Sequence, residues 1–268
     1  MKNNRIKEYS NIQYSSEENL TKRISLWSYG SNSESLQKWI FRNINLQKYE
    51  KVLELGGGTG KLWVENFKDV PSSCSILFSD YSENMLKKAK SNIESLNLPL
   101  QFKLIDAEKL LFPNQSFDIV LACHMLYHVQ NVKKTLQEIS RVLQPNGRFI
   151  ATTVSKHHIK ELKEFLAKYN LDFDMKEETF TEFRNESGKE ILKPYFKNIE
   201  FKEYINVVKI TSSDILLQYI ESMFPVEFYP NFQSLKPLIE NAIIERIKFD
   251  SAFKITGKNG LFLVTNPI

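Results

Sequence analysis

The chain has 268 residues, 42% hydrophobic and 25% charged, which is typical of a soluble globular protein with room for one large domain. Its net charge of +4 is small, and the lysines are scattered among acidic and amide residues, which disfavours a nucleic-acid-binding surface. The N-terminal segment lacks an apolar signal-peptide core and no apolar run is long enough to span a membrane, so we expect neither secretion nor membrane insertion. Cys74 and Cys123 form no CxxC pair, which fits a reducing compartment and predicts a cytoplasmic protein.

Helical segments are expected before the first strand. Leu20, Ile24 and Trp27 fall on one helical face. Ser31 with Glu34 three residues later has the pattern of a capping box. We therefore expect residues 1–45 to form an N-terminal helical cap.

From residue 51 to residue 153, short apolar runs alternate with segments of helical period, which predicts a parallel sheet with helices on both faces. Ser82 is placed to cap one of these helices, and the Pro/Gly turn at 144–147 is placed to stop another, which runs over 132–143. The predicted strands are 51–55, 75–80, 102–106, 117–122 and 148–153.

The remaining elements are less regular. Two further strands are expected at 199–205 and 260–265, and the segment 206–252 between them reads as a helical insertion. Insertions of this size often form a pocket wall. The predicted helices of this part lie near 156–169, 186–196, 213–223 and 232–248.

The first predicted strand runs into a glycine-rich turn, VLELGGGTG at 52–60. A phosphate-binding P-loop would need Ser or Thr where the chain has Leu62, and a dinucleotide fingerprint would need glycine where it has Lys61. We read Lys61 as a surface helix residue. The remaining pattern, Glu54-x-Gly56-x-Gly58-x-Gly60, lets a ligand approach bare main chain at the carboxyl edge of the sheet.

Acidic residues end the next two predicted strands. Asp80 is placed to accept hydrogen bonds from a ribose diol. Asp106 is followed by the backbone N–H of Ala107, a pair that can read the edge of an adenine ring. Together with the glycine turn, this order of features predicts a nucleoside ligand.

These segments resemble the class I S-adenosylmethionine-dependent methyltransferases, in the broad branch that acts mostly on small molecules. The resemblance covers residues 51–153, and no substrate-defining motif matches in 156–268. The matching stretches are VLELGGGTG, FSDYSENMLKKAK, IDAEKLLFPNQSFDIVLACHMLYHV and EISRVLQPNGRFIATT.

The resemblance implies roles for individual residues. The glycines would pack against the methionine portion and ribose of the cofactor, and Glu54 would orient the loop or the methionine amine. Asp80 would hold the ribose hydroxyls, Met85 would pack near the adenine, and Asp106 with Ala107 would read its edge. The implied cofactor-binding residues are Glu54, Gly56, Gly57, Gly58, Gly60, Asp80, Tyr81, Met85, Asp106, Ala107 and His124.

The fourth predicted strand ends at Cys123, followed by His124, Met125, Leu126, Tyr127 and His128. Methyl transfer from a sulfonium is an in-line displacement, so alignment is the main requirement, and a protonated acceptor also needs a base. His124 and His128 are the candidate catalytic residues, and at this spacing both can face one way on a helical turn. The alternatives are a packed histidine at 124 and a capping or core histidine at 128. Cys123 is interpreted as a small buried residue, and no metal site is expected.

Four aromatic or histidine side chains are candidate substrate contacts: Trp27, Tyr29, Tyr127 and His128. Trp27 has an equally ordinary alternative as a core residue. Phe224, Tyr229 and Phe232 in the insertion either form an aromatic wall for the substrate or pack the insertion onto the sheet.

We therefore expect an α/β protein with a Rossmann-like, doubly wound, mostly parallel seven-stranded sheet, a cap at 1–45, a cofactor-binding core at 46–155 and a C-terminal part at 156–268. The expected activity is transfer of a methyl group from S-adenosyl-L-methionine to a small molecule. The alternatives are an RNA methyltransferase and a non-catalytic cofactor-binding partner protein. Partners other than the small molecule are not expected: no DNA, because the Pro-Pro-aromatic pattern of base-amine methylation is absent, and no membrane. The sequence does not set the oligomeric state.

Overall fold

The computed structural model of the protein describes residues 26–171 and 183–268 apart from positions 226 and 228, so Leu20 and Ile24 lie outside the described residues. The chain forms two compact units. Among the described residues, unit 1 combines 26–33, 157–171 and the described part of 205–258, and unit 2 combines 34–156, 183–204 and 259–268.

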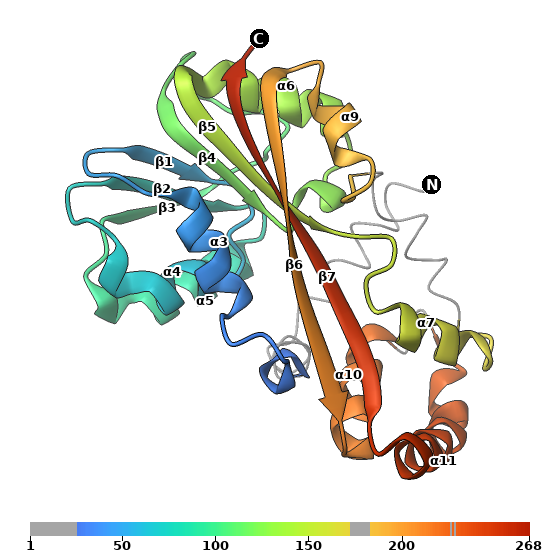
Figure 1. Ribbon diagram of the computed structural model, residues 1–268. Helices are drawn as coiled ribbons and strands as arrows, with labels where there is room; N and C mark the ends of the chain where they lie inside the picture. Colours follow the sequence, from blue (N-terminus) through green and yellow to red (C-terminus); the bar gives the residue numbers. More distant parts are fainter. Residues whose placement is uncertain (1–25, 172–182, 226, 228) are drawn as a thin grey trace. The chain divides into compact units, whose positions relative to one another are not determined.

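Unit 2 is built on a seven-stranded sheet in the order β3-β2-β1-β4-β5-β7-β6 (Figure 1). The five strands from β3 to β5 are parallel, and β7 runs antiparallel to β5. This confirms the predicted mostly parallel, doubly wound α/β sheet. The strands are β1 Lys51–Glu54, β2 Ser75–Asp80, β3 Leu100–Leu104, β4 Phe117–Cys123, β5 Leu143–Val154, β6 Phe196–Ile210 and β7 Phe253–Pro267.

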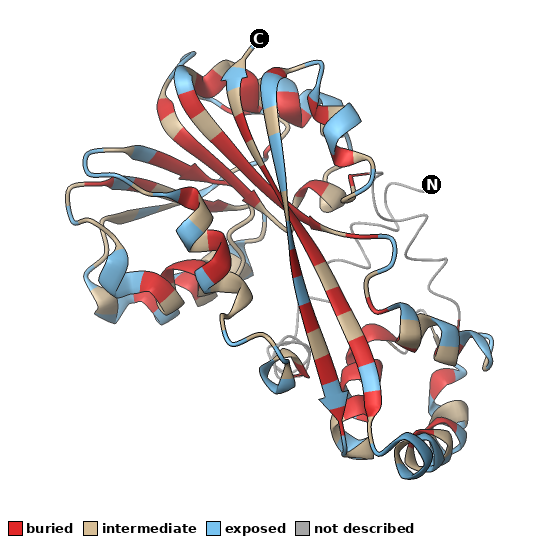
Figure 2. Cartoon of the chain, viewed as in Figure 1, coloured by how far each residue is buried: buried red, intermediate tan, exposed pale blue. Residues whose placement is uncertain are grey.

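Helices cover both faces of this sheet, and each face has its own core. Alternate residues of β4 divide between them: Ile119 and Leu121 pack with α3, α4 and α5, whereas Val120 and Ala122 pack with α6 and α9. Figure 2 shows the resulting concentration of buried residues along the central strands. The α-helices of unit 2 are α3 Leu36–Ile44, α4 Lys61–Asn66, α5 Glu83–Ile93, α6 Val132–Val142 and α9 Gly188–Leu192.

Helix starts follow the capping chemistry of the sequence, with one correction. The Ser82 hydroxyl accepts a hydrogen bond from the Met85 N–H, as predicted for the start of α5. The helix expected to open at Ser31 instead begins after Ser35, whose side chain accepts from the Lys38 N–H. Ser31 belongs to unit 1, where its N–H donates to the Val207 carbonyl at 2.9 Å.

The turn predicted at 144–147 is part of a strand. Helix α6 ends at Val142 and β5 begins at once with Leu143. A Cβ on Gly147 would lie 2.8 Å from the Asp118 carbonyl oxygen of the neighbouring strand. The glycine therefore permits close strand pairing here, next to the irregular register between Phe117 and Ile119.

Other boundaries also differ from prediction. β3 lies two residues earlier than predicted, and β6 and β7 are each 15 residues long, about twice the predicted length. The insertion between them is correspondingly shorter, 211–252, because both strands continue beyond the sheet of unit 2 and contribute residues to unit 1.

Unit 1 has a separate hydrophobic core, in which Leu26, Leu162, Leu216 and Ile243 are fully buried. The described part of the predicted cap is divided between the two units, because residues 26–33 belong to unit 1 and α3 belongs to unit 2. None of the helices in the described parts of the chain combines the length and apolarity needed to cross a membrane. The helices of unit 1 are η1 Leu26–Tyr29, α7 Lys160–Ala167, α10 Ser213–Met223 and α11 Phe232–Asp250.

Candidate cofactor and active site

The glycine turn after β1 has one face open. Gly56, Gly58 and Gly60 all have positive φ, between +60° and +75°. A Cβ at Gly56 would lie 2.7 Å from the Met125 Cβ, and one at Gly60 would lie 2.5 Å from the Ile93 Cδ1. At Gly58 an added Cβ would meet nothing within 4 Å. Packing inside the protein therefore accounts for two of these glycines, while Gly58 presents bare main chain to open space.

Glu54 is the last residue of β1, and its side chain lies next to the glycine turn. The residue is 2% exposed, and its Oε2 accepts a hydrogen bond of 2.5 Å from the indole N–H of Trp63. A Cβ on Gly57 would come within 2.9 Å of the same oxygen. Burial raises the pKa of Glu54 to about 7, the nearby Asp80 adds to this effect, and the Trp63 hydrogen bond opposes it. This geometry fits a carboxyl group that braces the loop, and Trp63 is a partner that the sequence did not single out.

Asp80 connects the end of β2 to the turn. Its Oδ2 accepts from the Gly58 N–H at 2.9 Å and its Oδ1 accepts from the Ser82 N–H at 2.8 Å. Burial raises the pKa of Asp80, against the lowering effect of its hydrogen bonds from the Ser82, Gly58 and Tyr81 backbone. A carboxylate has about four lone pairs, so this one retains acceptor capacity for ligand hydroxyls.

The adenine-side candidates follow at the same edge. Asp80 on β2 pairs with Leu104 on β3, and the Ile105 N–H donates to the Asp80 carbonyl at 3.1 Å. Asp106, the next residue of the chain, therefore lies near the end of β2. Asp106 is exposed, and Ala107 after it is buried. Met85 is half-buried in the first turn of α5, and Tyr81 is 60% exposed. The carboxyl edge of β1–β3 thus brings together the acids and glycines that the sequence predicted as a nucleoside site.

His124 lies just beyond β4 in a strained conformation. Its φ is +54°, and its N–H donates to both the carbonyl and the hydroxyl oxygen of Thr152 at 3.1 Å. Its Nε2 is buried and has no hydrogen-bond partner among the described residues. Burial lowers the pKa of His124 to about 4, so the ring is uncharged at neutral pH. The thiol of Cys123 is also disfavoured as an anion, because burial raises its pKa.

His128 ends a separate short turn, η4 Leu126–His128. Its N–H donates to the Met125 carbonyl at 2.8 Å, and its ring lies 4.6 Å from that of Tyr127. The two histidines do not share one helical turn, because the left-handed backbone at His124 interrupts the path before η4 begins. The shared helical turn that their spacing would allow is therefore not formed.

In unit 1, Trp27 has a packing role. Its ring lies 5.5 Å from His158 and 6.3 Å edge-on from Tyr219. A Cβ on Gly257 would lie 2.4 Å from the indole, so the glycine makes room for it. Tyr29 is 52% exposed and also belongs to unit 1, whereas Tyr127 and His128 belong to unit 2.

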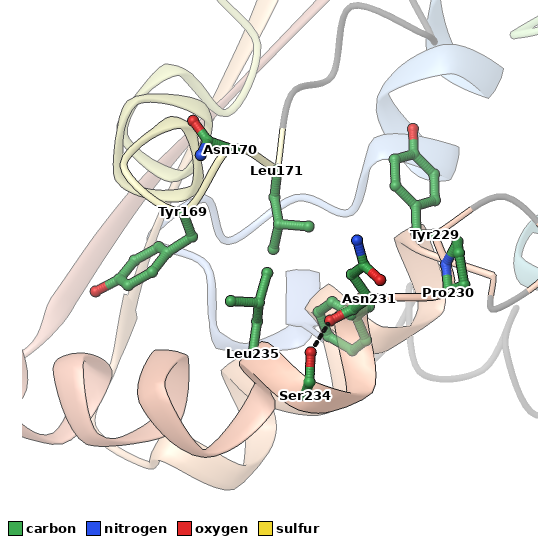
Figure 3. A pocket seen from close by; sticks show the side chains of 9 residues that line it. Tyr169, Asn170, Leu171, Tyr229, Pro230, Asn231, Ser234 and Leu235 are labelled. Atoms are coloured by element: carbon green, nitrogen blue, oxygen red, sulfur yellow. Dashed lines mark hydrogen bonds between the residues drawn. The ribbon is translucent and has the colours of Figure 1, made fainter.

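Unit 1 also contains a cavity of about 430 Å³ (Figure 3). In the figure Leu171 and Leu235 face each other on one side, and Tyr229 and Asn231 lie on the other. Of the predicted aromatic wall, Tyr229 and Phe232 line this cavity. Phe224 is 3% exposed, and its ring packs against both of them. The lining residues are Tyr169, Asn170, Leu171, Tyr229, Pro230, Asn231, Phe232, Ser234 and Leu235.

Comparison with known proteins agrees with this geometry. A methyltransferase-domain family matches residues 46–203, more than half of the chain. The ubiquinone/menaquinone biosynthesis C-methyltransferase UbiE of Rickettsia bellii is 32% identical over 152 residues, covering 55% of this chain and 60% of that protein. UbiE of Rickettsia massiliae is 34% identical over 126 residues, covering 45% and 51%. The chain therefore spans less than two thirds of the length of these relatives.

Solved structures show the same fold. The YcgJ protein of Bacillus subtilis superposes with a TM-score of 0.59 at 16% identity, covering 86% of this chain and 97% of that one. The phosphoethanolamine N-methyltransferase 2 of Haemonchus contortus, solved in complex with S-adenosyl-L-methionine, has a TM-score of 0.53 at 19% identity, with coverage of 87% and 52%. S-adenosylmethionine is the cofactor of the matched family. The chain thus belongs to the methyltransferase-domain family, among the class I S-adenosylmethionine-dependent methyltransferases.

Proposed function

We propose that this chain transfers the methyl group of S-adenosylmethionine to an uncharged small molecule. The observation that carries the proposal is the turn at 56–60, where Gly58 faces open space and donates its N–H to Asp80. Family membership identifies the cofactor, and the turn fits it, because this ligand needs bare main chain and a ribose-binding acid but no phosphate-binding lysine. Lys61 accordingly pairs with Glu65 on α4 at 3.3 Å.

We assign the cofactor contacts to unit 2. The main chain of Gly56, Gly58 and Gly60 and the carboxylate of Asp80 hold the methionine portion and the ribose, and buried Glu54 keeps the turn in shape. Asp106 and the Ala107 N–H read the adenine edge, with Met85 and Tyr81 beside the ring.

The histidines have different proposed roles. The bound cofactor supplies a methyl group carried by a cationic sulfur. An uncharged His124 adds no positive charge next to that cation, and the unpartnered Nε2 supports a hydrogen bond from this ring to a ligand. A pKa of about 4 makes His124 a weak base at neutral pH. We therefore assign proton removal, for acceptors that carry a proton, to His128.

One observation supports a small, uncharged acceptor: the Rickettsia relatives are named as C-methyltransferases of quinone biosynthesis. Free Cys74 and Cys123 are consistent with our placing the enzyme in the cytoplasm.

Calorimetry with S-adenosylhomocysteine tests the cofactor site. We expect the wild type to bind and Asp80→Ala to bind about 1–3 kcal/mol more weakly, or about 5- to 150-fold. Asp69→Ala, which removes an exposed acid elsewhere in unit 2, is the control and should bind like the wild type. Lack of binding by the wild type would refute the proposal.

A turnover assay distinguishes the methyltransferase from the alternative functions. Incubation with S-adenosylmethionine and a panel of uncharged phenols and quinols should release S-adenosylhomocysteine. Cofactor binding without turnover on any acceptor would favour a non-catalytic partner protein. RNA binding that survives moderate salt in a gel shift would favour an RNA methyltransferase.

A further inference from the structure

Glu108 joins two parts of the candidate site that are distant in sequence. Its Oε1 accepts hydrogen bonds from the Gln130 N–H at 2.7 Å and the Asn131 N–H at 3.1 Å. Its own N–H donates to the Asp106 Oδ1 at 2.9 Å. One residue therefore bridges the acid at the end of β3 and the segment that follows His128.

Both ends of this bridge are connected to α6 by hydrogen bonds. Asn131 caps α6, with its Oδ1 accepting from the Lys134 N–H at 3.0 Å. On the other side, the Leu110 N–H donates to the Glu138 Oε2 at 2.8 Å. Arg141 donates to the Leu110 carbonyl at 2.7 Å, so the loop after Asp106 is held to α6 at two places.

We propose that Glu108 is a positioning residue that couples the adenine end of the cofactor site to the segment that directly follows His128, at 129–131. This inference rests on the proposed function, because it uses the assignment of Asp106 to the adenine. When Asp106 contacts a ligand, the loop that carries it loses freedom, and the two charge-assisted hydrogen bonds of Glu108 extend that restriction to residues 130 and 131. The chain thereby orders the acceptor-side segment at the moment when the methyl donor is bound.

Amide hydrogen exchange with S-adenosylhomocysteine as the probe tests this coupling without any knowledge of the acceptor. In the wild type we expect the ligand to slow exchange in peptides spanning 127–135 by about tenfold. In Glu108→Ala the ligand should still slow exchange at the glycine turn, but its effect on 127–135 should disappear. A purely structural role would raise the exchange of 127–135 in the free protein and leave the ligand-induced difference in place.

Two further variants make the result decisive. Glu108→Gln keeps an oxygen that can accept both hydrogen bonds but removes the charge, so we expect an intermediate ligand effect and a folded protein even if the alanine variant unfolds. Lys109→Ala changes the exposed neighbour in the same loop and should behave like the wild type.

Three outcomes overturn the inference. The first is an equal ligand effect on 127–135 in wild type and Glu108→Gln or Glu108→Ala. The second is ligand binding by the wild type with no effect on 127–135, which refutes the coupling alone. The third is absence of ligand binding by the wild type, which refutes the proposed function and this inference with it.

Discussion

The glycine turn of unit 2 and the cavity of unit 1 both leave space for a ligand, but they are built differently. Around the turn, polar groups hold each other: Glu54 is bound to Trp63, and Asp80 to the Gly58 and Ser82 N–H groups. Around the cavity, the lining residues carry no formal charge, and the Ser234 hydroxyl donates only to the nearby Asn231 carbonyl at 2.8 Å.

The difference indicates what each region is suited to recognise. A preorganised set of main-chain groups and buried acids recognises one fixed ligand, because its geometry is already determined. Neutral side chains around an apolar space orient a ligand less strictly. We therefore expect substitutions at the turn of unit 2 to alter cofactor binding only. Substitutions at the cavity should alter only the binding of an uncharged molecule.

The largest expected effect concerns the buried acid under the turn. The folded pKa of Glu54 is about 7, above its ordinary 4.5, so Glu54 stabilises the fold fully below pH 4.5 and loses this contribution as the pH rises through 7. The change amounts to about 3 kcal/mol of unfolding free energy. Chemical denaturation across this range should show the stability of the wild type falling by that amount relative to Glu54→Gln.

The contribution of a second buried group, His124, to stability changes with pH in the opposite direction. The folded pKa of His124, about 4, lies below its ordinary 6.5, so its contribution is present above pH 6.5 and is lost as the pH falls through 4. The two effects partly cancel in the wild type, and His124→Gln should expose the fall due to Glu54. Parallel stability curves for the wild type and Glu54→Gln would show that Glu54 is ionised in the folded protein.

A smaller expected effect is the difference between alanine substitutions at Gly58 and at Gly56. Gly58→Ala should cost about 1–2 kcal/mol of stability, because of its left-handed backbone alone, and should weaken S-adenosylhomocysteine binding at least about tenfold, because the methyl group enters the ligand space. Gly56→Ala should cost about 1–3 kcal/mol more stability, since its methyl group collides with Met125. Thermal unfolding and calorimetry on both variants check this, and equal stability losses would contradict it.

The sequence predicted the sheet because its signals are local. Period-two apolar runs and the glycine turn are set by short stretches, and β2 at Ser75–Asp80 matches its predicted range in full. The prediction failed where a distant partner decides the conformation. Gly147 continues a strand because β4 needs close approach, and β6 and β7 are long because they serve both units.

Prediction of the candidate site from the sequence is limited in the same way. Asp80 and Asp106 could be read from strand ends, because parallel strands bring their carboxyl ends to one edge. The roles of Trp63 and Glu108 depend on contacts across nine and more than twenty residues. Glu108 lies within a stretch that carries the family resemblance, but no local pattern indicates its hydrogen-bond partners. Similarly, no periodicity of the sequence predicts the left-handed backbone of His124, whose N–H is hydrogen-bonded to Thr152 on the neighbouring strand.

The smallest expected effect tests the cavity of unit 1. Leu235→Trp should fill the space opposite Leu171 and weaken binding of 2-naphthol, an uncharged ring, by about 1 kcal/mol, or about fivefold. Leu238→Trp adds the same indole at a 56% exposed position of α11 outside the cavity and should leave this binding unchanged. Fluorescence titration measures both, with 2-naphthoate as the charged counterpart that should bind more weakly. Because the turn belongs to unit 2, neither variant should alter S-adenosylhomocysteine affinity, and a shared loss would show that the two regions do not act separately.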